Sequence, residues 1–127
     1  MAAVQNARAE RGQRAEAGAC AHLQRQGLRL VERNYRCSRG EIDLIMRDQE
    51  TLVFVEVRYR ASRRFGGAAA SVDTRKQARL IAAALHYLQQ HPAAGRRPCR
   101  FDVMAVVPGE GSAAMECEWI RSAFEAE

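Results

Sequence analysis

The sequence has no long apolar run and no closely spaced cysteine pair. Its longest purely apolar segment, residues 80–85, is far too short to cross a bilayer. The N-terminal residues include arginines and acids without an apolar signal core, so a cytoplasmic location is expected by default. No membrane partner is expected. Its four cysteines are scattered without a Cys-x-x-Cys motif, which argues against a zinc site or a redox pair.

Lysine is nearly absent. Of the twenty basic residues, Lys76 is the only lysine, and the formal net charge is +5. Arginine makes two-pronged contacts with phosphate, so a polyanionic partner such as nucleic acid is one explanation. A drift of the genome towards arginine codons is the other. Charge alone does not separate the two, because acids are numerous as well.

Glycine and proline are also few, with nine and three residues, while 47% of the chain is hydrophobic. This composition is typical of an ordinary globular protein and unlike a disordered one. A length of 127 residues predicts a single domain, residues 1–127, that is large enough for a real core.

Apolar periodicity predicts the order helix, three strands, helix, strand, strand. Alanine-rich residues 7–26 predict the first helix, which Gly27 ends. Asp73 or Thr74 caps a second helix that reaches about His91. Its apolar face is expected to comprise Leu80, Ile81, Ala84, Leu85 and Leu88. The strands are rich in β-branched and aromatic residues. They span residues 28–36, 41–47, 51–59, 101–107 and 116–121.

The connection between residues 59 and 101 contains a helix. Such a crossover favours parallel pairing of the two strands that it joins. The expected fold class is therefore α/β, a mixed sheet of four to five strands flanked by helices in the order αβββαββ.

Two acids, Asp43 and Glu56, lie inside apolar strands thirteen residues apart, and Arg58 follows the second. A buried carboxylate is costly unless a partner or a metal compensates it. If the hairpin between these strands is symmetric, paired residue numbers sum to 99. Asp43 then lies opposite Glu56, and Glu41 lies opposite Arg58, with opposed Cβ atoms roughly 5 Å apart.

Two explanations of this pair remain open on spacing alone. Carboxylates this close repel, and one stays protonated unless a cation lies between them. Mg²⁺ takes a few carboxylates, backbone carbonyls and waters, and leaves positions for phosphate oxygens. It also lowers the pKa of a bound water. Alternatively, Arg58 neutralises Glu41 and Glu56 in a structural network on a half-solvated sheet face.

A wider set of short motifs covers most of the chain. The motifs are Arg11-Gly12 with Glu16, Asn34-Tyr35-Arg36, residues 39–45, residues 52–58, Phe65-Gly66, Lys76 with Arg79-Leu80, and Arg100-Phe101-Asp102-Val103. Together they resemble the YraN family of predicted bacterial endonucleases, which belongs to the PD-(D/E)XK nuclease superfamily and is close to archaeal Holliday-junction resolvases. The resemblance implies a restriction-endonuclease-like fold. It also implies a Mg²⁺- or Mn²⁺-dependent nuclease that hydrolyses phosphodiester bonds in DNA, in branched or single-stranded forms.

By this resemblance Asp43 and Glu56 are metal ligands, the backbone carbonyl of Val57 is a third, and Glu16 completes the site. Arg58 stands where the superfamily usually has its catalytic lysine. Arginine keeps the charge but is effectively never deprotonated, which excludes a role as a base.

Five cations are candidate contacts to the nucleic-acid backbone, although each arginine is individually more typical of a solvated loop charge. They are Lys76, Arg39, Arg60, Arg63 and Arg64. The resolvase resemblance also suggests a homodimer in which two sites face two strands. Besides a nuclease, two functions remain open: a nucleic-acid-binding module without turnover, which Arg58 motivates, and a protein-interaction adaptor.

Overall fold

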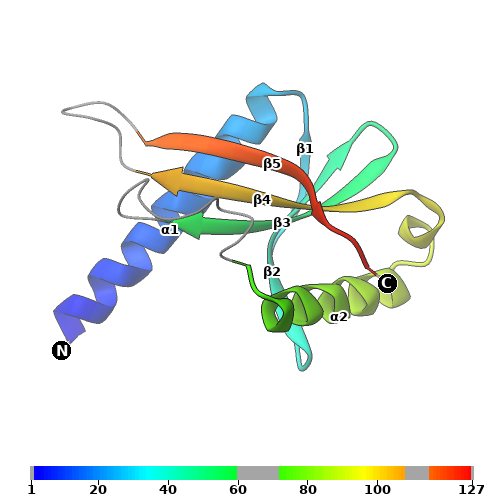
Figure 1. Ribbon diagram of the computed structural model, residues 1–127, viewed down its shortest axis with the longest axis horizontal. Coiled ribbons are helices and arrows are strands. Elements are labelled where there is room, and N and C mark those ends of the chain that lie inside the picture. The colour runs from blue at the N-terminus through cyan, green and yellow to red at the C-terminus, as the bar shows by residue number, and fades with distance from the viewer. Residues whose placement is uncertain (1, 60–71, 108–114, 127) are drawn as a thin grey trace.

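The computed structural model describes residues 2–59, 72–107 and 115–126, apart from the side chains of residues 2–9 and 11. Within these residues, two α-helices flank a five-stranded sheet (Figure 1). The elements are α1 (Ala2–Arg25), β1 (Arg29–Cys37), β2 (Gly40–Asp48), β3 (Thr51–Tyr59), α2 (Thr74–Gln90), a 3-10 turn η2 (Ala94–Arg96), β4 (Cys99–Val107) and β5 (Glu116–Phe124). The predicted α/β class and αβββαββ order are confirmed. No helix among the described residues is long and apolar enough to span a membrane.

The sheet is mixed, with strand order β1-β2-β3-β4-β5. β3 and β4 are parallel, whereas the other neighbours are antiparallel. The β3–β4 connection passes through α2, so the predicted crossover is confirmed.

The core is divided by the sheet into two apolar clusters. On one face, the buried residues Ala15, Ala19, Cys20 and Leu23 of α1 pack against inward residues of β2, β3 and β4. On the other face, Leu80, Ala83, Ala84 and Tyr87 of α2 pack against residues that include Phe54 and Phe101. Leu85 was predicted to lie on the apolar face of α2, but it is 52% exposed.

Both predicted helix boundaries have their expected chemistry. Gly27, with φ 98°, follows the end of α1, in a backbone conformation that a Cβ disfavours. At the start of α2, the Asp73 side chain caps the helix by accepting from the Lys76 N–H at 2.9 Å. This cap fixes Lys76 on the first turn of α2.

β2 turns over at Asp43. Ile42 belongs to the cluster under α2 and Leu44 to the cluster under α1, although residues two apart on a regular strand share a face. In the facing strand, Asn34 has φ 51° and lies between the pairs Arg33↔Leu44 and Tyr35↔Ile42. The β2–β3 ladder also ends here, at Leu44↔Val55. The first residues of β2 therefore leave β3 just where Asp43 lies.

Gly40 seats α2 against the start of β2, so Gly40→Ala is expected to destabilise the fold. An alanine Cβ would lie 3.0 Å from the carbonyl carbon of Arg79 and closer still to its oxygen. Relieving this clash requires a backbone shift, which costs about 1–3 kcal/mol. Urea unfolding measures the loss.

Gly18→Ala on α1 is the matched control, because nothing lies within 4 Å of the added methyl. Alanine is favoured over glycine inside a helix by about 0.5–1 kcal/mol, so this variant is expected to gain stability. Equal stabilities of the two variants would contradict the close packing at Gly40.

Candidate functional site

Asp43 is held beside β3 by its side chain and not by the strand ladder. Its Oδ2 accepts the backbone N–H of Val57 at 2.8 Å. The predicted register, with residue numbers summing to 99, is confirmed from Asp48↔Thr51 to Leu44↔Val55. Its extension to a ladder pair between Asp43 and Glu56 is wrong, because β2 turns away first. The Asp43 carboxylate takes the place of a backbone carbonyl as the acceptor for the Val57 N–H, which keeps Asp43 close to Glu56.

Glu56 is on β3, on the same sheet face as Phe54, which packs towards α2. Its side chain is 18% exposed and forms an ion pair with Arg58 over 3.8 Å. Burial, and after it the Asp43 carboxyl, raise the pKa of Glu56 to about 7, although Arg58 and Lys76 oppose the rise.

Asp43 also has a raised pKa, chiefly because it is buried. Burial brings the pKa of its carboxyl to about 6, although the Val57 N–H and Arg58 stabilise the ionised form. The acids Glu16 and Glu41 raise the pKa as well. Two carboxyls that each disfavour ionisation of the other form a site where an added cation is stabilising.

A third acid, Asp102, shows what a structural carboxylate looks like in this fold. It is fully buried on β4 and accepts from Arg100 Nε at 3.1 Å, from Trp119 Nε1 at 2.8 Å and from the Ser122 N–H at 2.9 Å. Buried charges are stable when they are paired and hydrogen-bonded in this way. Asp43 and Glu56 lack such a cage among the described residues, so the purely structural explanation fits Asp102 better than it fits them.

Glu16 on α1 acts on the site electrostatically. Burial raises the pKa of the Glu16 carboxyl, while the Asn34 side chain lowers it. Glu16 in turn contributes to the raised pKa of Asp43. Asn34, whose backbone is left-handed, faces Asp43 across the two strands.

Glu41 was predicted to lie opposite Arg58, and this is wrong. Glu41 pairs with Arg36 across the β1–β2 ladder, and their ion pair spans 3.5 Å with both side chains mostly exposed. Arg58 is engaged with Glu56 instead. Because β2 has already left β3 at Glu41, the hairpin register no longer relates the two strands here.

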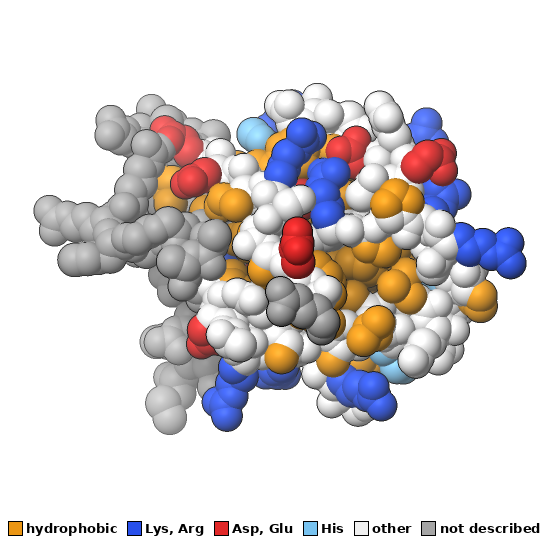
Figure 2. Space-filling model, turned by 45° about the vertical axis from the view of Figure 1, so that its right-hand side comes forward, with side chains coloured by type: hydrophobic (Ala, Val, Ile, Leu, Met, Phe, Trp, Pro, Cys, Tyr) orange, Lys and Arg blue, Asp and Glu red, His pale blue; other side chains and the backbone are white. Residues whose placement is uncertain are grey.

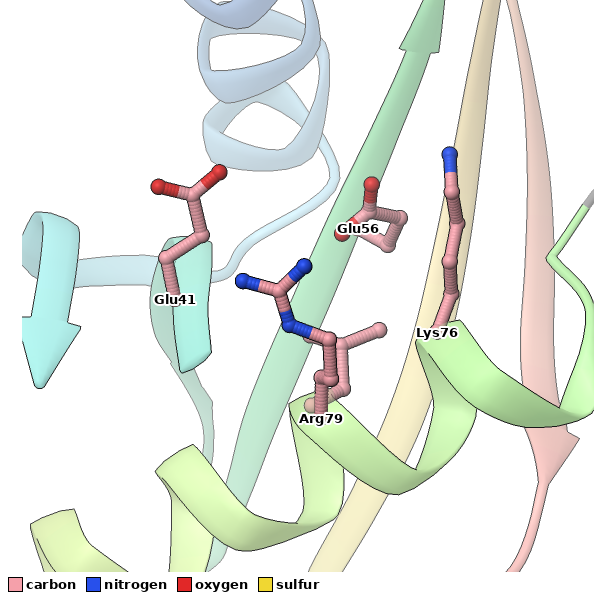
Figure 3. Close-up of a pocket in the computed structure, with 5 residues that line it drawn as sticks. Glu41, Glu56, Lys76 and Arg79 are labelled. Carbon is pink, nitrogen blue, oxygen red and sulfur yellow. The ribbon is translucent and has the colours of Figure 1, made fainter. Parts of the chain in front are cut away.

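A cavity of about 200 Å³ opens between Glu41 and Glu56 on one side and the first turns of α2 on the other. It is lined by Glu41, Glu56, Lys76, Arg79 and Leu80. In Figure 3 the Lys76 and Arg79 side chains rise from α2 towards the side of the cavity that bears the two acids. A site with carboxylates on one wall and cations on the other is suited to a bound metal ion and a phosphate group.

The predicted phosphate contacts have different outcomes. Lys76 lines the cavity, and Arg39 is exposed in the β1–β2 turn. Arg60, Arg63 and Arg64 lie outside the described residues. On the face shown in Figure 2, basic side chains are dispersed among acidic ones and do not form one patch. The cations at the cavity are therefore the structural candidates for anion binding.

The site fits a metal that needs few protein ligands. Within the described ranges, no three His, Cys, Asp or Glu side chains are grouped so that they could hold a metal ion. Mg²⁺ is commonly held by one or two carboxylates together with waters and substrate phosphates, so Asp43 and Glu56 suit it. Glu16 raises the pKa of Asp43 but does not form such a three-residue group with Asp43 and Glu56. The Val57 carbonyl stays a predicted ligand.

Comparison with known proteins places the chain in a family. A family model described as "Uncharacterised protein family UPF0102" matches residues 15–106. The chain belongs to the UPF0102 family. A UPF0102 protein of Nitrosococcus oceani is 54% identical over 93% of this chain and 94% of its own length. One of Pseudomonas aeruginosa is 50% identical over 92% and 94%, and one of Alcanivorax borkumensis is 53% identical over 91% and 92%.

Two residues of this UPF0102 protein join the site without having been assigned to it from the sequence. Arg79 lines the cavity three residues after Lys76, a spacing that places both on one face of a helix. Asn34 lowers the pKa of Glu16, and its signal in the sequence was an asparagine within an otherwise β-prone segment.

Proposed function

We propose that this UPF0102 protein is a divalent-metal-dependent nuclease that hydrolyses phosphodiester bonds in DNA, in branched or single-stranded forms. The observation that carries the proposal is the half-buried carboxyl pair Asp43 and Glu56, both with raised pKa values. Glu56 lines a cavity whose other lining residues include the cations Lys76 and Arg79. Perturbed acids in a cleft are typical of functional sites. The resemblance to the YraN nucleases gives the same chemistry. A cytoplasmic location and a homodimer remain part of the proposal.

Asp43 and Glu56 would hold Mg²⁺ or Mn²⁺, with the Val57 carbonyl and Glu16 as further proposed ligands. When bound, the ion supplies positive charge for phosphate oxygens and a water of lowered pKa. The Val57 N–H fixes one oxygen of Asp43, and the Arg58 guanidinium fixes the Glu56 carboxylate. These contacts orient both ligands before substrate arrives.

The reaction adds the oxygen of water to phosphorus and breaks the bond from phosphorus to one ester oxygen. One proton of the water ends on the leaving oxygen, which becomes a hydroxyl, and the other passes to the phosphate monoester or to solvent. Lys76 and Arg79 would contact phosphate groups of the DNA, and their position in the lining of the cavity beside Glu56 supports this role.

Cleavage of a substrate panel tests the proposal. The panel contains single-stranded, duplex, flap and four-way-junction DNA, each with Mg²⁺ or Mn²⁺ and with EDTA as the metal-free control. Wild-type protein is expected to cut at least one structure, and Asp43→Ala is expected to reduce the rate by at least about 1,000-fold because a ligand is lost. If no substrate is cut above the Asp43→Ala background, the nuclease proposal fails.

A second candidate function is DNA binding without turnover. The ion pair of Arg58 with Glu56 favours it, because a guanidinium in that position holds charge but exchanges no proton. Such a module would shift DNA with steep salt dependence and leave it uncut. A protein that neither cuts nor shifts DNA at low salt would point to the protein-interaction adaptor.

A further inference from the structure

Lys76 combines three features at the cavity. It is the one lysine in a chain of nineteen arginines. The Asp73 cap fixes it on the first turn of α2, and its side chain lines the cavity together with Glu56 (Figure 3). Its charge lowers the pKa of Glu56, so the ammonium acts electrostatically on that carboxylate.

The cations beside Glu56 are engaged differently. Arg58 is only 22% exposed and is held in its ion pair with Glu56. Lys76 forms no ion pair within 4.0 Å with any residue that the structure describes. A cation that is not ion-paired with a nearby carboxylate attracts an arriving anion more strongly.

We propose that Lys76 is the catalytic cation of this site: its ammonium contacts a non-bridging oxygen of the attacked phosphate and stabilises the charge that develops there. Arg79, three residues further on the same helix face, holds the adjoining phosphate group. The inference rests on the proposed nuclease function and assigns within it the residue that acts on the reacting group. Lys76 itself forms and breaks no covalent bond.

Physical chemistry favours a lysine on α2 for this task. An ammonium is a compact charge with three rotatable donors, so it follows a phosphate whose geometry changes during reaction. The N-terminal end of a helix adds partial positive charge in the same place. Groups aimed at charge that develops during a reaction are among the largest contributors to enzyme catalysis.

The test compares Lys76→Ala with Arg75→Ala. The Arg75 substitution removes the same charge from the same turn of α2, but Arg75 is not among the residues that line the cavity. Lys76→Ala is expected to lower the single-turnover rate at saturating DNA by about 100- to 1,000-fold, the usual cost of losing one such donor. DNA affinity in Ca²⁺ should weaken by less than about fivefold, since a single phosphate contact contributes little to it. Arg75→Ala is expected to keep the wild-type rate.

A readout independent of cleavage is Mn²⁺ affinity, measured by calorimetry on DNA-free protein. Removing a cation near Glu56 should tighten Mn²⁺ binding by about two- to fivefold in Lys76→Ala, because like charges repel. Damage to the fold would weaken it. Lys76→Arg retains the charge, so its rate should exceed that of Lys76→Ala by at least about tenfold.

Two results would overturn the inference and leave the nuclease function standing. One is a Lys76→Ala rate at saturating DNA within about threefold of an active wild type, which would make Lys76 a binding contact only. The other is an unchanged Mn²⁺ affinity, which would place the ammonium outside the field of the site. Wild-type protein that cuts nothing overturns both proposals at once.

Discussion

Glu56→Gln is expected to stabilise the metal-free protein near neutral pH while it abolishes cleavage. Burial and the Asp43 carboxyl raise the pKa of Glu56 from its ordinary 4.5 to about 7. Between these two pH values the folded state holds more protons than the unfolded state, so this group's contribution to stability falls as pH rises through that window. The cost is greatest above the folded-state pKa, at about 1–3 kcal/mol. A neutral glutamine removes it.

Urea unfolding in EDTA between pH 4 and pH 9 measures this effect. The difference between Glu56→Gln and wild type should grow from pH 4.5 to pH 7 and then level off. Glu41→Gln is the control. Glu41 lines the same cavity, but its side chain is 60% exposed. It should change stability by less than about 0.5 kcal/mol.

Mn²⁺ should reverse the order of stabilities. Binding to the folded state alone raises the stability of wild type by mass action, and the glutamine variant gains little because a ligand is missing. A Glu56→Gln protein that is less stable than wild type in EDTA at pH 8 would mean that the carboxylate is satisfied where it lies. The pair would then be structural, as Asp102 is.

The destabilising effect of the Asp43–Glu56 pair and its proposed metal binding have one physical origin. Asp102 has three good hydrogen-bond donors around it, so its burial serves the fold. Asp43 and Glu56 repel each other and are compensated only in part, by the Val57 N–H and by Arg58. Sites that are costly for the folded chain are often those used for binding or chemistry.

Much of the fold was predictable because local patterns determine it. The two-residue turn at Gln49 and Glu50 fixes the β2–β3 register, which holds from Asp48↔Thr51 to Leu44↔Val55. Strand alternation likewise assigns the inward faces of β3. The helix cap at Asp73 is a local hydrogen bond that a sequence motif encodes.

The turn-over of β2 at Asp43 was not predictable from register, because the contacts that produce it are not local. It requires the left-handed Asn34 of β1, the Val57 N–H of β3 and the close approach of Arg79 to Gly40. A register argument assumes that strands stay flat and paired, so it placed Glu41 opposite Arg58 when Arg36 is its partner.

On α2 the prediction placed Leu80 and Ala84 inward correctly, but it also placed Leu85 there. The buried stripe runs through Leu80, Ala84 and Tyr87, since the helix presents that face to Phe54 and its neighbours. Once this face is fixed, Lys76 and Arg79 follow on the side that lines the cavity. The rotation of a helix about its axis depends on what it packs against, so the apolar residues at the border of its stripe are not determined by the sequence.

Moving a lysine to position 58 is expected to rescue the loss of Lys76. The position-58 side chain reaches the Glu56 carboxylate from β3, over 3.8 Å, whereas Lys76 approaches the same acid across the cavity from α2. In the Lys76→Ala background, Arg58→Lys should raise the single-turnover rate at least about tenfold, since it returns an ammonium to the reacting phosphate. The same substitution in wild type should give a smaller gain, because residues serving one function do not contribute additively.

The four proteins of this cycle separate the two functions that the site can serve. A larger gain in the Lys76→Ala background means that the two positions share one role, and that a nuclease with Arg58 works through its lysine on α2. Equal gains in both backgrounds would contradict that sharing. A wild type that is inactive until Arg58→Lys is introduced would mean that the protein is a DNA-binding module. Its metal ligands would be intact, and the ion pair of Arg58 with Glu56 would be what prevents cleavage.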